Sequence, residues 1–108
     1  MSYRIRRYEC KNNELFPELL VVGKSYWFYG PIAGSLRCVD NNLFVNIEIF
    51  SDFFKQTEDW EWFSWCEDVF AQAVTDGTAS LISVEEVEVA PIDLVTLEYH
   101  GYIYKLAV

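Results

Sequence analysis

Residues 43–50 read LFVNIEIF and carry the clearest periodic pattern in the chain. Apolar side chains occupy every second position from Leu43 to Ile49, while Asn46 and Glu48 occupy two of the positions between them. A period of two is typical of a β-strand that is buried on one face only. The segment therefore predicts a strand over residues 43–50 and a fold that is built on a sheet.

Further strands are expected on both sides of this segment, because turn signals separate other runs of strand-favouring residues. Asp40-Asn41-Asn42 and His100-Gly101 have the composition of hairpin turns. Gly30-Pro31 is expected to end the strand that precedes it. The expected strands are residues 2–9, 19–22, 25–29, 32–39, 43–50, 78–84 with an interrupted continuation over 87–89, 94–99 and 102–108.

Residues 51–75 show a different pattern, because they contain neither Pro nor Gly and Asp76-Gly77 follows them as a helix stop. Thr57 is suited to cap a helix, with Glu58 in the first turn, where the helix dipole favours negative charge. At helical spacing, one face of the segment is apolar and is expected to pack on the sheet. Its members are Trp62, Phe63, Cys66, Val69, Phe70, Ala73 and Val74.

Together these elements predict one α+β domain that spans residues 1–108, a length that suits a single core. Strands joined by short turns pair in antiparallel fashion, and a helix with one apolar face covers one side of the sheet. The predicted architecture is a mostly antiparallel sheet of about 6–8 strands, with one main helix over about residues 57–75 on one face.

The net charge of the chain is −9, from 17 acidic residues against 8 Lys and Arg residues. This surplus argues against direct binding of nucleic acid or of an anionic membrane, since both need a dense positive surface. No secretory signal or membrane-spanning run is visible, so a cytoplasmic protein is expected. Three cysteines without a CxxC motif are expected to be buried thiols rather than a disulfide framework.

No pattern typical of catalysis is present, whether a Gly-rich phosphate loop, GxSxG, HExxH or EF-hand spacing. The one histidine, His100, precedes Gly101 in an expected turn and is a poor candidate to activate a cysteine. We therefore expect no enzyme, no cofactor and no dedicated metal site.

Acidic residues are concentrated in residues 48–98, where 13 of them stand against one base, Lys55. An acidic face can serve solubility alone, or it can steer a basic partner toward the protein. Trp60 and Trp65 lie on the flanks of the expected helix, where they either anchor an interface or complete the core. The candidate partner-binding residues are Glu58, Asp59, Trp60, Glu61, Ser64, Trp65, Glu67, Asp68, Glu85 and Glu86.

In its size, acidity and aromatic content, and in the segment from Glu58 to Asp68, the chain resembles the immunity proteins of bacterial toxin systems. That resemblance implies a cytoplasmic protein that binds a toxin domain, often a basic nuclease, and blocks its active site. Two alternatives remain open. One is a nucleic-acid mimic that inhibits a host defence protein. The other is an α+β domain that binds a small ligand, with Trp27, Phe28 and Tyr29 as pocket walls.

Overall fold

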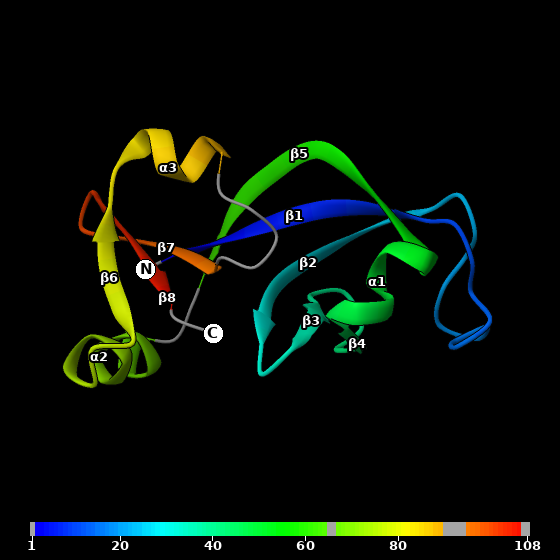
Figure 1. Ribbon diagram of the computed structural model, residues 1–108, viewed down its shortest axis with the longest axis horizontal. Helices are drawn as coiled ribbons and strands as arrows, with labels where there is room; N and C mark the ends of the chain where they lie inside the picture. Colours follow the sequence, from blue (N-terminus) through cyan, green and yellow to red (C-terminus); the bar gives the residue numbers. More distant parts are fainter. Residues whose placement is uncertain (1, 65–66, 90–94, 107–108) are drawn as a thin grey trace. The chain divides into compact units, whose positions relative to one another are not determined.

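The computed structural model describes residues 2–64, 67–89 and 95–106 (Figure 1). Contacts within the chain divide it into two compact units. The meander unit comprises Ile5–Trp60, and the C-terminal unit comprises Glu61–Val108 together with Met1–Arg4. Each unit is built mainly from antiparallel strands.

The meander unit takes its name from four consecutive strands, which the chain forms before a short helix and a long strand. The elements are β1 (Ser2–Cys10), β2 (Ser25–Ile32), β3 (Ser35–Cys38), β4 (Phe44–Asn46), α1 (Ile47–Phe53) and β5 (Phe54–Ser64). The first residues of β1, up to Arg4, and the last residues of β5, from Glu61, belong to the C-terminal unit. The turn between β2 and β3 is Ala33-Gly34, where φ is 53° and 77°. Positive φ at both positions matches the twist of the flanking strands and closes a two-residue hairpin.

Aromatic rings form the core of the meander unit. Phe28 is 1% exposed and meets the rings of Tyr8, Phe50 and Phe54 at centroid distances of 5.7, 5.0 and 4.9 Å. All three contacts are edge-on, the arrangement that aromatic quadrupoles favour. Because Phe28 lies at the centre of this cluster, β2, α1 and the start of β5 depend on one shared core.

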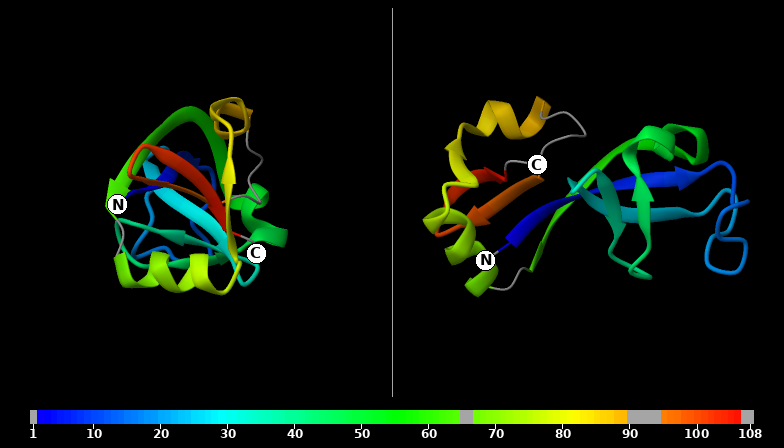
Figure 2. Two further views of the ribbon diagram at one scale, coloured as in Figure 1. Left: turned by 90° about the vertical axis from the view of Figure 1, so that its left-hand side faces the viewer. Right: turned by 60° about the horizontal axis from the view of Figure 1, so that its bottom comes forward.

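The C-terminal unit combines three antiparallel strands, in the order β7-β8-β6, with two short helices (Figure 2). Its elements are α2 (Glu67–Thr75), β6 (Ala79–Ile82), α3 (Val84–Val89), β7 (Val95–Tyr99) and β8 (Tyr102–Leu106). The predicted hairpin turn at His100-Gly101 is confirmed, with φ of 50° and 80° and Tyr99 paired with Tyr102. Val87, Val95, Thr96 and Leu97 are its most buried side chains among the described residues, each at most 2% exposed.

The described strands form an eight-stranded sheet in the order β4-β3-β2-β1-β7-β8-β6, and β5 pairs with β1 outside this path. Antiparallel pairing joins β1 to β2 and β7, β3 to β2 and β4, and β8 to β6 and β7. The predicted α+β class with a mostly antiparallel sheet is confirmed.

The helix predicted over residues 57–75 is wrong in its first half. Residues up to Ser64 extend β5, and α2 begins only at Glu67. Thr57 caps no helix, because its hydroxyl donates a hydrogen bond to the carbonyl oxygen of Arg7. Threonine and the aromatic residues of this stretch favour strands, and pairing with β1 outweighs the helical spacing.

The apolar face predicted for that helix is not a buried surface over the residues whose side chains are described. Phe63 and Val74 are 44% and 45% exposed. Phe63 instead lies edge-on to Tyr3, with ring centroids 5.6 Å apart. Cys66 lies outside the described residues.

The strand predicted over residues 43–50 is confirmed only as far as Asn46. There the side-chain oxygen of Asn46 accepts a hydrogen bond from the backbone N–H of Glu48 at 2.8 Å and caps α1. An N-cap of this kind satisfies a backbone donor that has no partner within the helix. The alternation of apolar residues beyond Asn46 was therefore a misleading signal.

Three other predictions about strands need correction. Residues 19–22 lie in turns and irregular chain, and residues 87–89 belong to α3 rather than to a strand. Strand β2 continues through Gly30-Pro31, a cis peptide bond, as far as Ile32. Leu94 and residues 107–108, which the last two predicted strands include, lie outside the described residues.

Candidate protein-binding surface

Strand β5 places Glu58 and Asp59 in solvent at the end of the meander unit. Asp59 Oδ2 lies 3.3 Å from Nη1 of Arg7 on β1, and both side chains are well exposed. The backbone N–H of Asp59 donates to the Thr57 hydroxyl at 3.3 Å. Exposed ion pairs contribute at most about 1 kcal/mol, so this pair orients Asp59 more than it stabilises the fold. The carboxylate of Glu58 has no ion-pair partner among the described residues.

Trp60 follows these acids on β5 and is 38% exposed. More than a third of its surface therefore reaches solvent, although the ring also has contacts within the protein. Tryptophan is one of the residues that are enriched among the anchors of protein interfaces. The position of Trp60 is consistent with an anchor, whereas Trp65 lies outside the described residues.

The C-terminal unit holds most of the negative charge. It contains nine of the 17 acidic residues and only two of the eight Lys and Arg residues, a net charge of −7. The two bases are little available, because Arg4 is 7% exposed and Lys105 is half-buried. The acids that its described part exposes are Glu61, Asp76, Glu85, Glu86 and Glu88.

Glu86 has a structural role that the sequence analysis did not assign. Its carboxylate accepts hydrogen bonds from the backbone N–H and the hydroxyl of Ser83 at 2.9 and 3.3 Å, while the Ser83 hydroxyl accepts from the N–H of Glu86. This reciprocal arrangement is a capping box at the start of α3. The hydrogen bond from the Ser83 backbone holds the pKa of Glu86 below its ordinary value, and Lys105 adds to the effect.

The ten predicted residues are divided between the two units. Glu58, Asp59 and Trp60 belong to the meander unit, and the others belong by sequence to the C-terminal unit. Ser64 and Glu85 are exposed. Glu67 and Asp68 are the first two residues of α2. Sequence reasoning missed Ser83 and Arg7; the Ser83-x-x-Glu86 spacing is the signal that predicts the cap.

The cysteines predicted to be buried thiols are confirmed where they are described. Cys10 and Cys38 are free thiols, 1% and 0% exposed. Burial raises the pKa of both thiols, which keeps them protonated and unreactive at neutral pH. No three His, Cys, Asp or Glu side chains gather as metal ligands within the described ranges.

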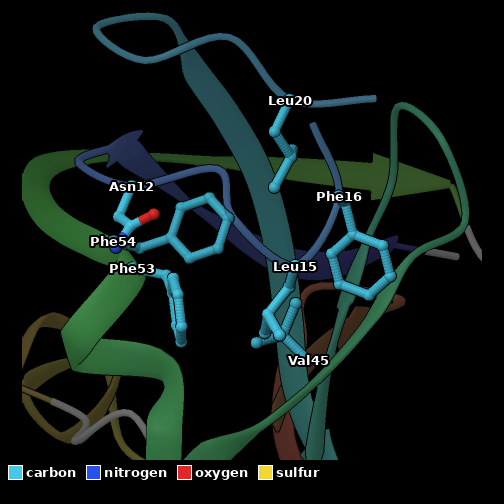
Figure 3. Close-up of a pocket in the computed structure, with 7 residues that line it drawn as sticks. All are labelled: Asn12, Leu15, Phe16, Leu20, Val45, Phe53 and Phe54. Carbon is cyan, nitrogen blue, oxygen red and sulfur yellow. The ribbon is translucent and has the colours of Figure 1, made fainter. Parts of the chain in front are cut away.

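One hollow in the meander unit bears on the small-ligand hypothesis (Figure 3). Its volume is about 170 Å³, including open solvent, which is smaller than the 300 Å³ or more of usual ligand pockets. Phe28, predicted as a pocket wall, packs in the core instead. The hollow is lined by Asn12, Leu15, Phe16, Leu20, Val45, Phe53 and Phe54.

Comparison with known proteins gives no relative. No family model, no curated protein and no solved structure matches the chain. Over the residues that the structure describes, no helix combines the length and the apolar character needed to cross a membrane.

Proposed function

We propose that the chain is a cytoplasmic inhibitor of the immunity type, which binds a basic protein and blocks the surface with which that protein acts. The observation that carries the proposal is that the exposed charge of the C-terminal unit is almost entirely negative. Its described part exposes five acids, while its two bases are buried or half-buried. A surface of one sign raises the rate of encounter with a partner of the opposite sign.

Apolar side chains on the same unit supply the contacts that charge alone does not. Leu81, Val84 and Tyr102 are each 60% exposed, and Phe63 is 44% exposed. Interfaces gain most of their affinity from a few anchors, which are often aromatic as Tyr102 and Phe63 are, whereas the surrounding carboxylates fix orientation and speed association. A basic nuclease or toxin domain, with a cationic groove for phosphates, has the matching chemistry.

The proposal is tested with two double variants of equal net charge. Glu61→Lys with Glu85→Lys reverses two exposed acids of the C-terminal unit, neither of which has a side-chain partner among the described residues. Glu14→Lys with Glu18→Lys reverses two exposed acids of the meander unit and serves as the matched control. Each protein is immobilised in lysate of the source cells, and the captured proteins are identified, purified and assayed for activity.

We expect the wild-type protein to capture one basic protein, to inhibit its activity and to release it as salt is raised. The Glu61/Glu85 variant should associate at least about tenfold more slowly, and the Glu14/Glu18 variant should resemble the wild type. An equal reduction of the association rate in both variants would mean that the net charge of the protein, and not the position of the acids, determines binding. A captured protein that is not inhibited, or no capture at all, would overturn the inhibitor hypothesis. Capture of a nucleic-acid-binding defence protein would instead favour the alternative hypothesis, in which the chain mimics nucleic acid and inhibits a host defence protein.

A further inference from the structure

Three side chains form a row across β2, β3 and β4, which lie side by side in the meander unit (Figure 1). Arg37 on β3 is the direct cross-strand partner of Tyr29 on β2 and of Phe44 on β4. Directly paired residues project from the same face of a sheet, so the arginine lies between two aromatic neighbours. The opposite face of these strands carries the buried residues Leu36 and Val45.

The guanidinium of Arg37 is held in place from several sides. Nη1 donates to the Tyr29 hydroxyl at 3.0 Å, and Nη2 donates to the side-chain oxygen of Asn42 at 3.0 Å. Its central carbon lies 5.4 Å from the centroid of the Phe44 ring and 6.0 Å from that of Tyr29. Asn42 reaches this position from a turn in which its φ is 58°. A guanidinium that is already held by fixed acceptors and lies beside an aromatic ring loses little conformational freedom when it binds a further group.

Arg37 is nevertheless not neutralised. In a chain with 17 acidic residues, none of the described carboxylates forms an ion pair with it. A guanidinium carries five N–H donors, and the two hydrogen bonds leave three of them for another acceptor. Arg37 is half-buried, whereas the adjacent Phe44 is 58% exposed. The row therefore offers a charged donor beside an accessible apolar ring.

We propose that Arg37 and Phe44 form a binding point for a carboxylate of a protein partner, with Tyr29 and Asn42 as positioning residues. A carboxylate oxygen accepts the remaining N–H donors of Arg37, and the apolar part of the same partner residue packs on Phe44. The site lies wholly in the meander unit and does not depend on the proposed function.

Charge decides between a carboxylate and a phosphate as the ligand. The meander unit has six bases against eight acids, and this net negative charge disfavours a polyanion such as nucleic acid. A single carboxylate brings one negative charge, and Arg37 can offset it. The exposed ring of Phe44 further favours a ligand that has both a carboxylate and an apolar part.

Phenylacetate is a suitable probe, because it has one carboxylate and one ring. The Nε–H signals of Arg37 and Arg7 are followed by NMR while the intact protein is titrated with phenylacetate, with neutral phenylacetamide, or with inorganic phosphate at matched ionic strength. Arg7 already pairs with Asp59 and is the internal control. We expect saturable binding of phenylacetate at Arg37, with a Kd on the order of 10 mM, as one or two charge-assisted hydrogen bonds provide.

Variants separate a binding role from a purely structural one. Arg37→Lys keeps the charge but lacks the planar fork, and it should weaken binding at least about fivefold. Phe44→Ala should weaken it about threefold without unfolding the hairpin, since the ring is largely exposed. Arg7→Lys and the Glu61/Glu85 double variant should bind phenylacetate as the wild type does.

Three results would overturn the proposal. The first is a linear, unsaturated shift at Arg37 that matches the shift at Arg7. The second is equal binding of phenylacetamide, which would show that the carboxylate is not recognised. The third is tighter saturation with phosphate than with phenylacetate, which would make the site one for phosphate.

Discussion

The rings of Phe50 and Phe54 stack at a centroid distance of 4.7 Å with their planes 15° apart. Phe50 is the buried residue of α1, and Phe54 is the first residue of β5. The backbone N–H of Phe54 also donates to the carbonyl oxygen of Phe50 at the end of the helix. These two residues therefore fix the point at which the chain leaves the helix and enters the long strand.

Replacing Phe50 with alanine should lower the free energy of unfolding by about 3–5 kcal/mol, the usual cost of removing a buried aromatic ring. The side chain is 2% exposed and contacts three other rings, so little relaxation can fill the space. Urea denaturation followed by circular dichroism measures the change. Ile49→Ala in the same helix is the control; Ile49 is 37% exposed and should cost much less. Equal losses in the two variants would contradict the described core.

The cap at Asn46 should be measurable on its own. Asn46→Ala removes the acceptor for the N–H of Glu48 and should cost about 1 kcal/mol of stability. Asn46→Asp keeps an acceptor at the same place and should retain most of the stability, since aspartate caps as well as asparagine. The two variants are compared by thermal and urea unfolding. If aspartate destabilised as much as alanine, the side chain would not act as a cap.

The capping box at α3 predicts a dependence on pH. Folding lowers the pKa of Glu86, chiefly through the hydrogen bond from the Ser83 backbone, from an ordinary value of 4.5. The charged form is thus favoured in the folded state, and its contribution to stability is present above the unfolded pKa and is lost as pH falls through the folded pKa. We compare wild type and Glu86→Gln by urea unfolding between about pH 6 and pH 3.

The advantage of the wild type over Glu86→Gln should be constant above about pH 5.5 and should shrink steadily on acidification. Glu85→Gln is the matched control, because Glu85 is also exposed but has no part in the cap. A constant difference between wild type and Glu86→Gln across the whole range would show that the charge of Glu86 does not contribute.

Gly30 is expected to tolerate no side chain. Its φ is +124°, and a Cβ there would lie 3.0 Å from the carbonyl oxygen of Ser35 and 3.2 Å from the Leu36 side chain. Gly30→Ala should therefore cost more than about 2 kcal/mol, from backbone strain and from displacement of β3. Gly34→Ala is the control, because its φ is also positive but nothing lies near its Cβ. Gly34→Ala should lower the free energy of unfolding by about 1 kcal/mol, as measured by urea unfolding.

The sequence correctly predicted strands that are bounded by turn-forming residues. The prediction of secondary structure failed where two signals favoured different structures for the same segment. β1 and the β7–β8 hairpin follow directly from alternation and from His100-Gly101. Residues after Asn46 alternate as a strand does, yet the cap at Asn46 and the burial of Phe50 select a helix. Conversely, pairing with β1 makes residues 57–64 a strand, and single-sequence periodicity does not contain that long-range contact.

The candidate surface was predictable only as a distribution of charge. The acidic surplus of residues 48–98 is a property of composition, and the structure exposes Glu58, Glu61 and Glu85 as charged side chains usually are. The ion pair of Asp59 with Arg7 joins β5 to β1 and needs the strand pairing to be known. The row of Tyr29, Arg37 and Phe44 depends on register across three strands, which the sequence does not show.

The pairing of β1 with β7 has a consequence for the order in which the chain acquires structure. Ser2 and Tyr3 pair with Glu98 and Leu97, whereas the ladders from β1 to β4 connect residues between Arg6 and Asn46. On the ribosome, β2, β3 and β4 emerge early and can close these nearer ladders first. The first residues of β1 can pair with β7 only after β7 has been synthesised. Until then the backbone edge of these residues is unpaired and can bind other strands incorrectly. Vectorial synthesis therefore makes the first residues of β1, which are synthesised before β2, β3 and β4, among the last to be fixed in the sheet.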